Sequence, residues 1–417
     1  MRFFGLCIAS LLSAAATAEI LENGQPRENP YPGQAPVVNV ANNSTWKSYP
    51  PNAHQLSYKG RWDSKYISWW SAPGLKFGFT GQNLAISFGN YTDAGVLVAY
   101  RVDGEDWLFS NLTANTTHQF VTPATIGENV TVPANALQTF EMRVTNWALG
   151  VQLAGVSVGC NETLVKIPDY TKRLEVIGDS LSAGQYATYE GLSSYSYGLG
   201  AGFGDVEYSI TAYPGICLHD SRCYDNMHGQ TYQWSHTSDT SYRALQIYGD
   251  NPEVWDFSKA PAADIVIMNL GTNDNNTINN ITATEFYDSY VQLINEVHST
   301  WPDAQIIVMS LWGGWSPSGN TFVQTAAFIP QIPAVVEHFN GSLSAKADSS
   351  SFVHLFNTTG VLQHNDIGPQ YHPTDVGHVK LASHLMQYIK LNFGWELAAV
   401  GPQVQSHTLY WNDQTSY

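Results

Sequence analysis

Four residues in the second half of the chain could together carry out chemistry on an acyl group, and each stands beside the end of an expected element. Ser180 closely follows an apolar run that ends at Gly178. A serine on a strand-to-helix turn exposes its hydroxyl for nucleophilic attack, and the N-terminus of the next helix stabilises negative charge. The alternative interpretation is that Asp179 or Ser180 only caps that helix.

Three further residues follow in an order that suits the same chemistry. Gly215 comes after the second strand, where the missing side chain lets its backbone N–H approach a reacting carbonyl. Asn273 follows the third strand, and its amide can donate to a developing oxyanion. His372 stands before the last helix as a general base for a serine near neutral pH. Taken singly, the three could be a turn glycine, a turn asparagine with an Asx hydrogen bond and a solvated loop histidine.

A metal site is a competing interpretation of the histidines. His372 and His378 flank the start of the last expected helix, but no carboxylate or cysteine pattern accompanies them. We therefore expect no metal and no cofactor, and a structural role for His378.

The elements that must position these residues are apolar strands that alternate with helices. The expected strands are Leu174–Gly178, Val206–Thr211, Asp264–Leu270, Gln305–Ser310 and Phe352–Phe356. The expected helices are Ala283–Trp301, Thr321–Phe339 and Val376–Phe393. Near-continuous apolar strands joined by helices form a parallel sheet that is covered on both faces. Active sites of such sheets lie at the carboxyl ends of the strands, where Ser180, Gly215 and Asn273 fall.

The first half of the chain shows a different pattern. Residues Glu19 to Ser57 are rich in Pro, Asn and Gly and are expected to form an irregular arm. From Gly60 to Gly159, short runs with apolar alternation recur about every ten residues, which predicts an antiparallel sandwich or barrel without an amphipathic helix. These runs are Leu75–Phe79, Leu84–Phe88, Gly95–Val102, Gln138–Val144 and Gly150–Val158.

The composition excludes two classes of partner. Charged residues make up 13% of the 417 residues, and the formal net charge is −17. Nucleic acids and anionic membranes attract basic surfaces, so neither is expected as a partner, and a neutral substrate fits best. The 13 Trp, 23 Tyr and 17 Phe suit β-sheet cores or surfaces that stack on sugars. Trp312 and Trp315 follow another strand and could stack on sugar rings or pack under the sheet edge.

The N-terminus has the pattern of a secretory signal peptide. Met1-Arg2 is positive, Phe3 to Leu12 is apolar, and Ala16-Thr17-Ala18 is a small-x-small cleavage pattern. The apolar run is too short for a membrane anchor, which needs about 20 residues. Sequons for N-glycosylation support a secreted, extracellular glycoprotein. They begin at Asn42, Asn43, Asn90, Asn111, Asn115, Asn129, Asn161, Asn275, Asn280, Asn340 and Asn357.

The cysteines agree with an oxidising compartment. Cys7 would leave with the signal peptide, and the close pair Cys217 and Cys223 is the expected disulfide. Cys160 is then left over and is expected to be buried, although a disulfide from Cys160 to either of the others stays open.

The four chemical residues stand in blocks that resemble those of SGNH, or GDSL-type, hydrolases. The blocks are GDSL at Gly178–Leu181, Gly215, GTND at Gly271–Asp274 and HPTDVGH at His372–His378, and the resemblance covers about Leu174 to Phe393. It implies that Ser180 is the nucleophile and that His372 is the base. It also implies an oxyanion hole made by the Ser180 backbone N–H, Gly215 and Asn273.

One position departs from this family. The family usually has an acid three residues before the histidine, where this chain has Pro369. Asp366 lies further upstream and could substitute for it. Otherwise a backbone carbonyl orients His372, which gives a Ser-His dyad, and the intervening Gly368 and Pro369 make us expect the dyad.

A β-sandwich ahead of an SGNH domain with a weak or absent triad acid resembles the second family of carbohydrate esterases. The resemblance implies a jelly-roll-like antiparallel sandwich followed by a flavodoxin-like α/β domain, and a secreted esterase that removes acetyl groups from xylan or glucomannan. The expected regions are a signal peptide at 1–18, the sandwich at 19–160, the hydrolase domain at 173–396 and a tail at 397–417. A general esterase or lipase on short acyl esters and a carbohydrate-binding protein with an inactive hydrolase domain are the alternatives.

Overall fold

The computed structural model describes residues 21–22, 25–26, 34–105, 107–123, 136–341 and 351–397. The predicted signal peptide, Cys7, the Asn129 sequon and the tail beyond residue 397 lie outside these residues. Among the helices that the structure describes, none is long and apolar enough to cross a membrane.

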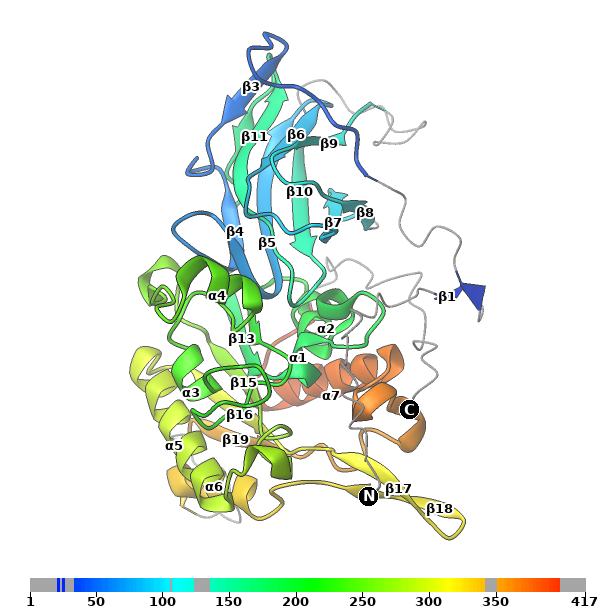
Figure 1. Ribbon diagram of the computed structural model, residues 1–417, viewed down its shortest axis with the longest axis vertical. Helices are drawn as coiled ribbons and strands as arrows, with labels where there is room; N and C mark the ends of the chain where they lie inside the picture. The colour runs from blue at the N-terminus through cyan, green and yellow to red at the C-terminus, as the bar shows by residue number, and fades with distance from the viewer. Residues whose placement is uncertain are drawn as a thin grey trace, which may run out of the picture.

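The alternating residues of the first half form two antiparallel sheets that pack face to face, as predicted (Figure 1). The first sheet consists of β3 (Trp46–Tyr49), β11 (Leu153–Gly159), β6 (Leu84–Phe88) and β9 (Thr117–Val121). The strands of the second sheet in this half are β4 (Ser57–Trp62), β5 (Ser68–Thr80), β10 (Leu137–Val144), β7 (Leu97–Val102), β8 (Leu108–Asn111) and β12 (Leu164–Val165). Buried aromatic rings such as Phe77 and Phe140 stack between the sheets, with ring centroids 5.2 Å apart. We call this part the sandwich.

The second half, here the α/β half, contains a parallel sheet in the predicted flavodoxin-like order β19-β16-β15-β13-β14. Its strands are β13 (Lys172–Gly178), β14 (Val206–Ala212), β15 (Ile265–Asn269), β16 (Gln305–Met309) and β19 (Val353–Phe356). Helices α5 (Ala283–Thr300) and α6 (Gln331–Asn340) cover one face, and α2 (Tyr195–Phe203) and α7 (Asp375–Phe393) cover the other. Along β15, Val266 and Met268 therefore face α5 while Ile265 and Ile267 face α7.

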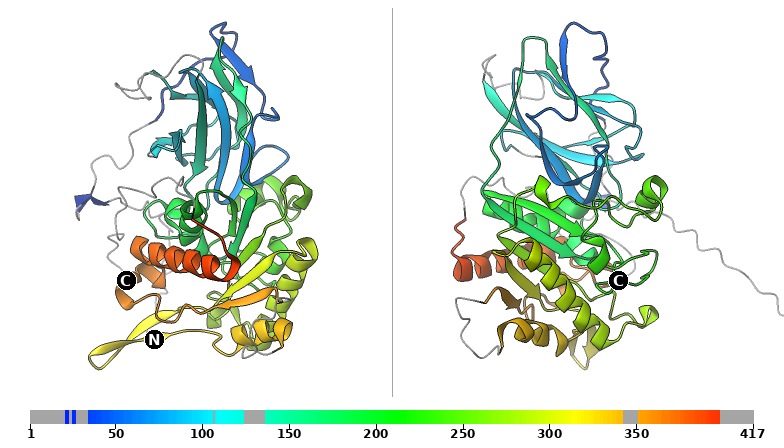
Figure 2. Two further views of the ribbon diagram at one scale, coloured as in Figure 1. Left: turned by 180° about the vertical axis from the view of Figure 1, so that it is seen from behind. Right: turned by 90° about the vertical axis from the view of Figure 1, so that its left-hand side faces the viewer.

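The sandwich and the α/β half share one sheet. Strand β14 lies at the edge of the parallel strands, and its Ile210 pairs with Ser71 of β5 in antiparallel fashion. The pairing makes a continuous 11-stranded sheet that runs the length of the molecule (Figures 1 and 2). The remaining short elements are β1 (Leu21–Glu22), β2 (Gln25–Pro26), α1 (Ser180–Ala183), α3 (Gln230–Gln233) and α4 (Tyr242–Tyr248).

The predicted helix over Thr321–Phe339 is wrong in its first part. Thr321–Thr325 is strand β18, which pairs with β17 (Gly314–Ser318) in a hairpin that projects from the sheet edge (Figure 2). The β-branched and aromatic residues of Thr321–Thr325 favour a strand, and Gly319 adopts the positive φ of +61° that the tight turn needs. Helix α6 begins only at Gln331, after Pro330.

Two further predictions on the first half and the cysteines need correction. The arm before Ser57 is not wholly irregular, because β3 pairs with β11. The disulfide between Cys217 and Cys223 is confirmed, but Cys160 is a free and exposed cysteine. It follows the last residue of β11 at the turn to β12, so it lies beyond the packed faces of the sheets.

Candidate functional site

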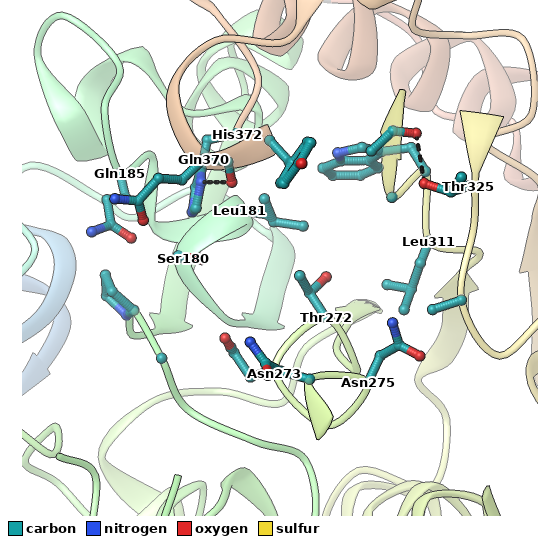
Figure 3. Close-up of a pocket in the computed structure, with 18 of the residues that line it drawn as sticks. Ser180, Leu181, Gln185, Thr272, Asn273, Asn275, Leu311, Thr325, Gln370 and His372 are labelled. Carbon is teal, nitrogen blue, oxygen red and sulfur yellow. Dashed lines mark hydrogen bonds between the residues drawn. The ribbon is translucent and has the colours of Figure 1, made fainter. Parts of the chain in front are cut away.

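The four predicted site residues line one cavity at the carboxyl ends of the parallel strands. The cavity has a volume of about 710 Å³, and Ser180, Gly215, Asn273 and His372 all border it. His372 and Asn273 lie on opposite sides of Ser180 (Figure 3). Residues that are distant in the sequence are thus brought together as the strand-end rule predicts, while their chemical roles stay predictions.

Ser180 is the first residue of α1, and Asp179 is its N-cap. The Asp179 carboxylate accepts a hydrogen bond from the Leu181 N–H at 3.0 Å. Capping is therefore done by Asp179, and the Ser180 hydroxyl is not used for it. This arrangement leaves the serine on the cavity wall, at the positive end of a short helix.

Gly215 and Asn273 lie on neighbouring loops that are tied to each other. Gly215 has φ +77°, and a Cβ there would approach the Asn226 Nδ2 to 3.0 Å, so both the conformation and the space favour glycine. The Asn273 side chain donates to the Ile216 carbonyl oxygen at 2.8 Å. An amide carries two N–H donors, and this bond, which holds the glycine loop, uses one of them.

His372 is oriented by the backbone. Its Nδ1 lies 2.9 Å from the carbonyl oxygen of Gln370, and because a carbonyl only accepts, Nδ1 carries the proton. The Tyr186 ring packs edge-on against the imidazole, with centroids 5.0 Å apart. Gln370 and Tyr371 have φ of 49° and 63°, a costly left-handed conformation for residues with side chains.

Asp366 has other partners than the histidine. Its carboxylate oxygens lie 2.7 and 2.6 Å from the Lys380 Nζ, and one accepts from the Gln363 N–H at 2.9 Å. Its side chain is buried, so the ion pair with α7 holds it in place. The structure therefore gives His372 a carbonyl partner and gives Asp366 a lysine partner.

Two residues of the cavity lining, Ser180 and Asn273, have a buried carboxyl group as a neighbour in the sequence. Burial, with a smaller contribution from the nearby Asp274, raises the pKa of Asp179 to about 7. Burial also raises the pKa of Asp274, whose carboxylate accepts from the backbone N–H groups of Leu218 and His219. Both carboxyl groups, one of which caps α1, therefore lose their proton less readily than an exposed aspartic acid does.

His378 is a packed, neutral histidine. Its Nδ1 accepts from the Tyr195 N–H at 3.1 Å, and its ring stacks on that of Tyr195. Burial, with a smaller contribution from the charge of His372, lowers its pKa to about 3. Across the described ranges no group of three His, Cys, Asp or Glu side chains could hold a metal ion.

The aromatic side chains at the cavity differ from the sequence expectation. Trp312 is among the residues that line the cavity, but its side chain is fully buried in the core between the sheet and α7, which fits the packing interpretation. Trp315 is half-buried against the same core. Tyr224 and Tyr371 were not singled out by the sequence, yet they line the cavity with exposed rings. Their positions next to Cys223 and His372 are the only sequence signal that could have found them.

Comparisons with known proteins agree with this fold and these blocks. Residues 176–380 match the model of the GDSL-like Lipase/Acylhydrolase family. The cellulase/esterase CelE of Acetivibrio thermocellus is 27% identical over 359 residues, which cover 82% of this chain but only 40% of that protein. The resemblance that the sequence blocks predicted is confirmed.

Two solved structures share the fold along nearly their whole length. A family two carbohydrate esterase from Clostridium thermocellum, solved in complex with cellohexaose, has a TM-score of 0.63 and 22% identity, and the match covers 82% of this chain and all of that one. An acetyl xylan esterase, Est2A, from the rumen bacterium Butyrivibrio proteoclasticus has a TM-score of 0.64 and 16% identity, covering 84% and 99%. At these identities the likeness establishes the fold.

The partners of Asp366 predict a small catalytic effect of Asp366→Asn. The imidazole keeps its carbonyl acceptor, so kcat on an aryl acetate should stay within about tenfold of wild type, whereas loss of a true triad acid can cost ~10⁴-fold. The melting temperature should fall, because the ion pair with Lys380 is lost. A loss of kcat beyond a hundredfold in a folded variant would show that Asp366 acts on the histidine.

The burial of Asp179 predicts that Asp179→Asn increases the thermal stability of the protein by an amount that depends on pH. The cap itself is kept, since asparagine caps a helix as well as aspartate does. The folded-state pKa is raised, so the contribution of Asp179 to stability is full below its ordinary pKa of about 4 and is lost as the pH rises toward about 7. Measured by thermal unfolding, the melting temperature of the variant minus that of wild type should therefore increase between about pH 4 and about pH 8. A flat or decreasing difference would contradict this environment for Asp179.

Proposed function

We propose that this chain, a GDSL-like hydrolase over residues 176–380 with the fold of the family 2 carbohydrate esterases, is a secreted serine esterase that removes acetyl groups from plant cell-wall polysaccharides such as xylan or glucomannan. One observation carries the proposal. A strand-end serine, a histidine whose Nδ1 is held by a backbone carbonyl, and two candidate oxyanion donors border the same cavity. No metal or cofactor is needed for this chemistry.

In the proposed mechanism, Ser180 Oγ attacks the acetyl carbonyl carbon and His372 Nε2 accepts the serine proton. The hydrogen bond from Nδ1–H to the Gln370 carbonyl fixes the tautomer that leaves Nε2 as the acceptor. The oxyanion is stabilised by the N–H groups of Ser180 and Gly215 and by the Asn273 amide. As the bond to the sugar oxygen breaks, His372 gives that oxygen the proton and a sugar hydroxyl leaves. Water then attacks the acetyl-enzyme, His372 accepts the water proton and returns it to Ser180 Oγ, and acetate is released.

The substrate class is supported by the net charge of the chain and by the aromatic side chains that line the cavity. The net charge of −17 disfavours acidic substrates, and an acetylated neutral sugar chain carries no charge to repel. The exposed rings of Tyr224 and Tyr371 offer apolar faces at the cavity. The relatives named above are described as a cellulase/esterase, a family two carbohydrate esterase and an acetyl xylan esterase, and the second of them was solved in complex with cellohexaose.

Secretion is supported by the sequence at the N-terminus and by the sequons. Eight of the ten sequon asparagines in the described residues are exposed, and Asn111 and Asn340 are half-buried. An exposed asparagine is what N-glycosylation requires. The chain spans about 40% of the curated relative that it matches, so this assignment is made for the present sequence and not carried over from that protein.

The first test is Ser180→Ala. Removing the nucleophile should lower acetate release from acetylated xylan, acetylated glucomannan and an aryl acetate at least ~1,000-fold, because catalysis by the remaining groups is small. Folding is checked by an unchanged melting temperature. Activity above about a tenth of wild type would refute the serine mechanism. A wild type active on aryl and lipid esters but not on the polysaccharides would favour a general esterase instead.

The second test compares Asn273→Ala with Asn251→Ala. In the proposed mechanism Asn273 donates to the oxyanion, so its loss should lower kcat ~100- to 1,000-fold with a smaller change in KM. Asn251 is exposed and is not among the residues that line the cavity, so it serves as the control, with kcat expected within about threefold. A loss for Asn273→Ala that is confined to KM would make Asn273 a substrate-binding residue.

A further inference from the structure

The sandwich touches the elements that carry the proposed active site at several points. After β10, the Thr145 carbonyl accepts from the Gly191 N–H at 2.9 Å, and the Trp147 N–H donates to the Glu190 carboxylate at 3.2 Å. Glu190 and Gly191 begin a short 3-10 turn (Glu190–Ser193) that follows α1 closely in the chain. A segment of the sandwich is thus hydrogen-bonded to the region just beyond Ser180.

Strand β5 adds a second tie at the nucleophile turn. The Ser71 hydroxyl donates to the carbonyl of Ala183, the last residue of α1, at 3.1 Å. The same Ser71 forms the bridge to Ile210 of β14. One residue of the sandwich therefore contacts both the helix that begins with Ser180 and the strand that leads to Gly215.

The most direct contact with the Gly215 loop is made by Trp147. Its ring meets the ring of Tyr213 edge to face, with centroids 5.5 Å apart and planes at 86°. Only Pro214 separates Tyr213 from Gly215. On the other side, the Asn226 Nδ2 donates to the Pro214 carbonyl at 3.1 Å. The loop is held between a tryptophan of the sandwich and an asparagine next to the disulfide.

The position of Gly215 makes such support necessary. A glycine loses more conformational freedom on folding than any other residue, and it has no side chain of its own to pack. An oxyanion donor acts only if its N–H stays aimed at the developing charge, and a displacement of about 1 Å can cost ~100-fold in rate. The packing of its neighbours must therefore fix the Gly215 backbone.

We infer that Trp147 is a positioning residue for the oxyanion hole, so that the sandwich is part of the catalytic unit and not a separable binding module. The inference rests on the proposed esterase activity. Trp147 does not touch the reacting atoms; it acts through Tyr213 on the backbone of Gly215. The edge-to-face contact with Trp147 fixes the orientation of the Tyr213 ring in addition to burying apolar area, since such aromatic pairs are directional.

The test compares Trp147→Ala, Trp147→Phe and a matched control, Trp107→Ala. Trp107 lies in the same sandwich and packs half-buried against the same hydrophobic cluster, but its ring stacks on Arg101 and not on a site loop. On an aryl acetate, Trp147→Ala should lower kcat about 10- to 100-fold with KM within about threefold. Trp147→Phe should recover most of the rate, and Trp107→Ala should keep kcat within about threefold.

Hydrogen exchange of the backbone gives a readout that does not depend on activity. The backbone amides of Tyr213, Gly215 and Ile216 should exchange faster in Trp147→Ala than in wild type and in Trp107→Ala. Unchanged kcat and exchange in a folded Trp147→Ala, or equal kcat losses in Trp147→Ala and Trp107→Ala, would overturn the inference. If Trp147→Ala does not fold, Trp147→Leu takes its place with the same expectations.

This design separates the inference from the proposed function. A wild-type protein without esterase activity refutes the proposed function, and the exchange measurement then still decides whether Trp147 fixes the Gly215 loop. An active wild type with an unmoved loop in Trp147→Ala refutes only the role of Trp147.

Discussion

The burial of the parallel strands on both faces is the constraint that decides where this chain can carry out chemistry. Helices cover both faces of strands β13, β15 and β16. The side chains along these strands must therefore be apolar, or their polar groups must have hydrogen-bond or ion-pair partners. Polar reactive groups can stand only where the strands end. The positions of Ser180 after β13 and of Asn273 after β15 follow from this constraint.

The exception within the strands shows how strictly it applies. Glu175 lies in the middle of β13 and is buried, and its carboxylate lies 3.7 Å from the guanidinium of Arg61 in the sandwich. Burial lowers the pKa of Arg61 to about 10, while Glu175 raises it. Arg61 also donates to the backbone carbonyls of Trp234 and His236. A buried charge of the α/β half is thus paired with a buried charge of the sandwich.

How much the sequence could predict follows from the same physics. Apolar runs locate buried strands well, so β6 has the predicted bounds and β13 to β16 differ by one or two residues. The blocks at the strand ends predicted which four residues meet. The hairpin β17–β18 was missed because its residues are mostly exposed, and a strand held by one partner leaves a weak pattern. Cys160 was misplaced because burial of a free cysteine is a statistical tendency, and a turn beyond β11 overrides it.

The partner of His372 could be predicted in kind but not in detail. The sequence favoured a backbone carbonyl over Asp366, but it could not show which carbonyl, because the bond to Gln370 depends on positive φ angles at Gln370 and Tyr371, which neither residue type favours. Two such residues cost on the order of 1–3 kcal/mol each. The loop offsets this cost through the bonds from the Gly368 N–H to the His372 carbonyl and from the Thr374 N–H to the Asp366 carbonyl. Asp366 therefore supports the histidine loop from a distance, through its pairing with Lys380.

The edge of the parallel sheet explains why the sandwich lies where it does. Strand β14 has β13 on one side only, and an unpaired edge would expose its N–H and C=O groups. The bridge from Ile210 to Ser71 pairs part of that edge, and the adjacent cluster of Ile67, Trp69 and Trp70 packs against Tyr213 just beyond the end of β14. Because β14 leads directly into the loop of Gly215, whatever covers the edge also borders the oxyanion loop. The same contact surface of the sandwich thus protects the edge of the sheet and supports the proposed catalytic loop. The stability of the α/β half therefore depends on the presence of the sandwich.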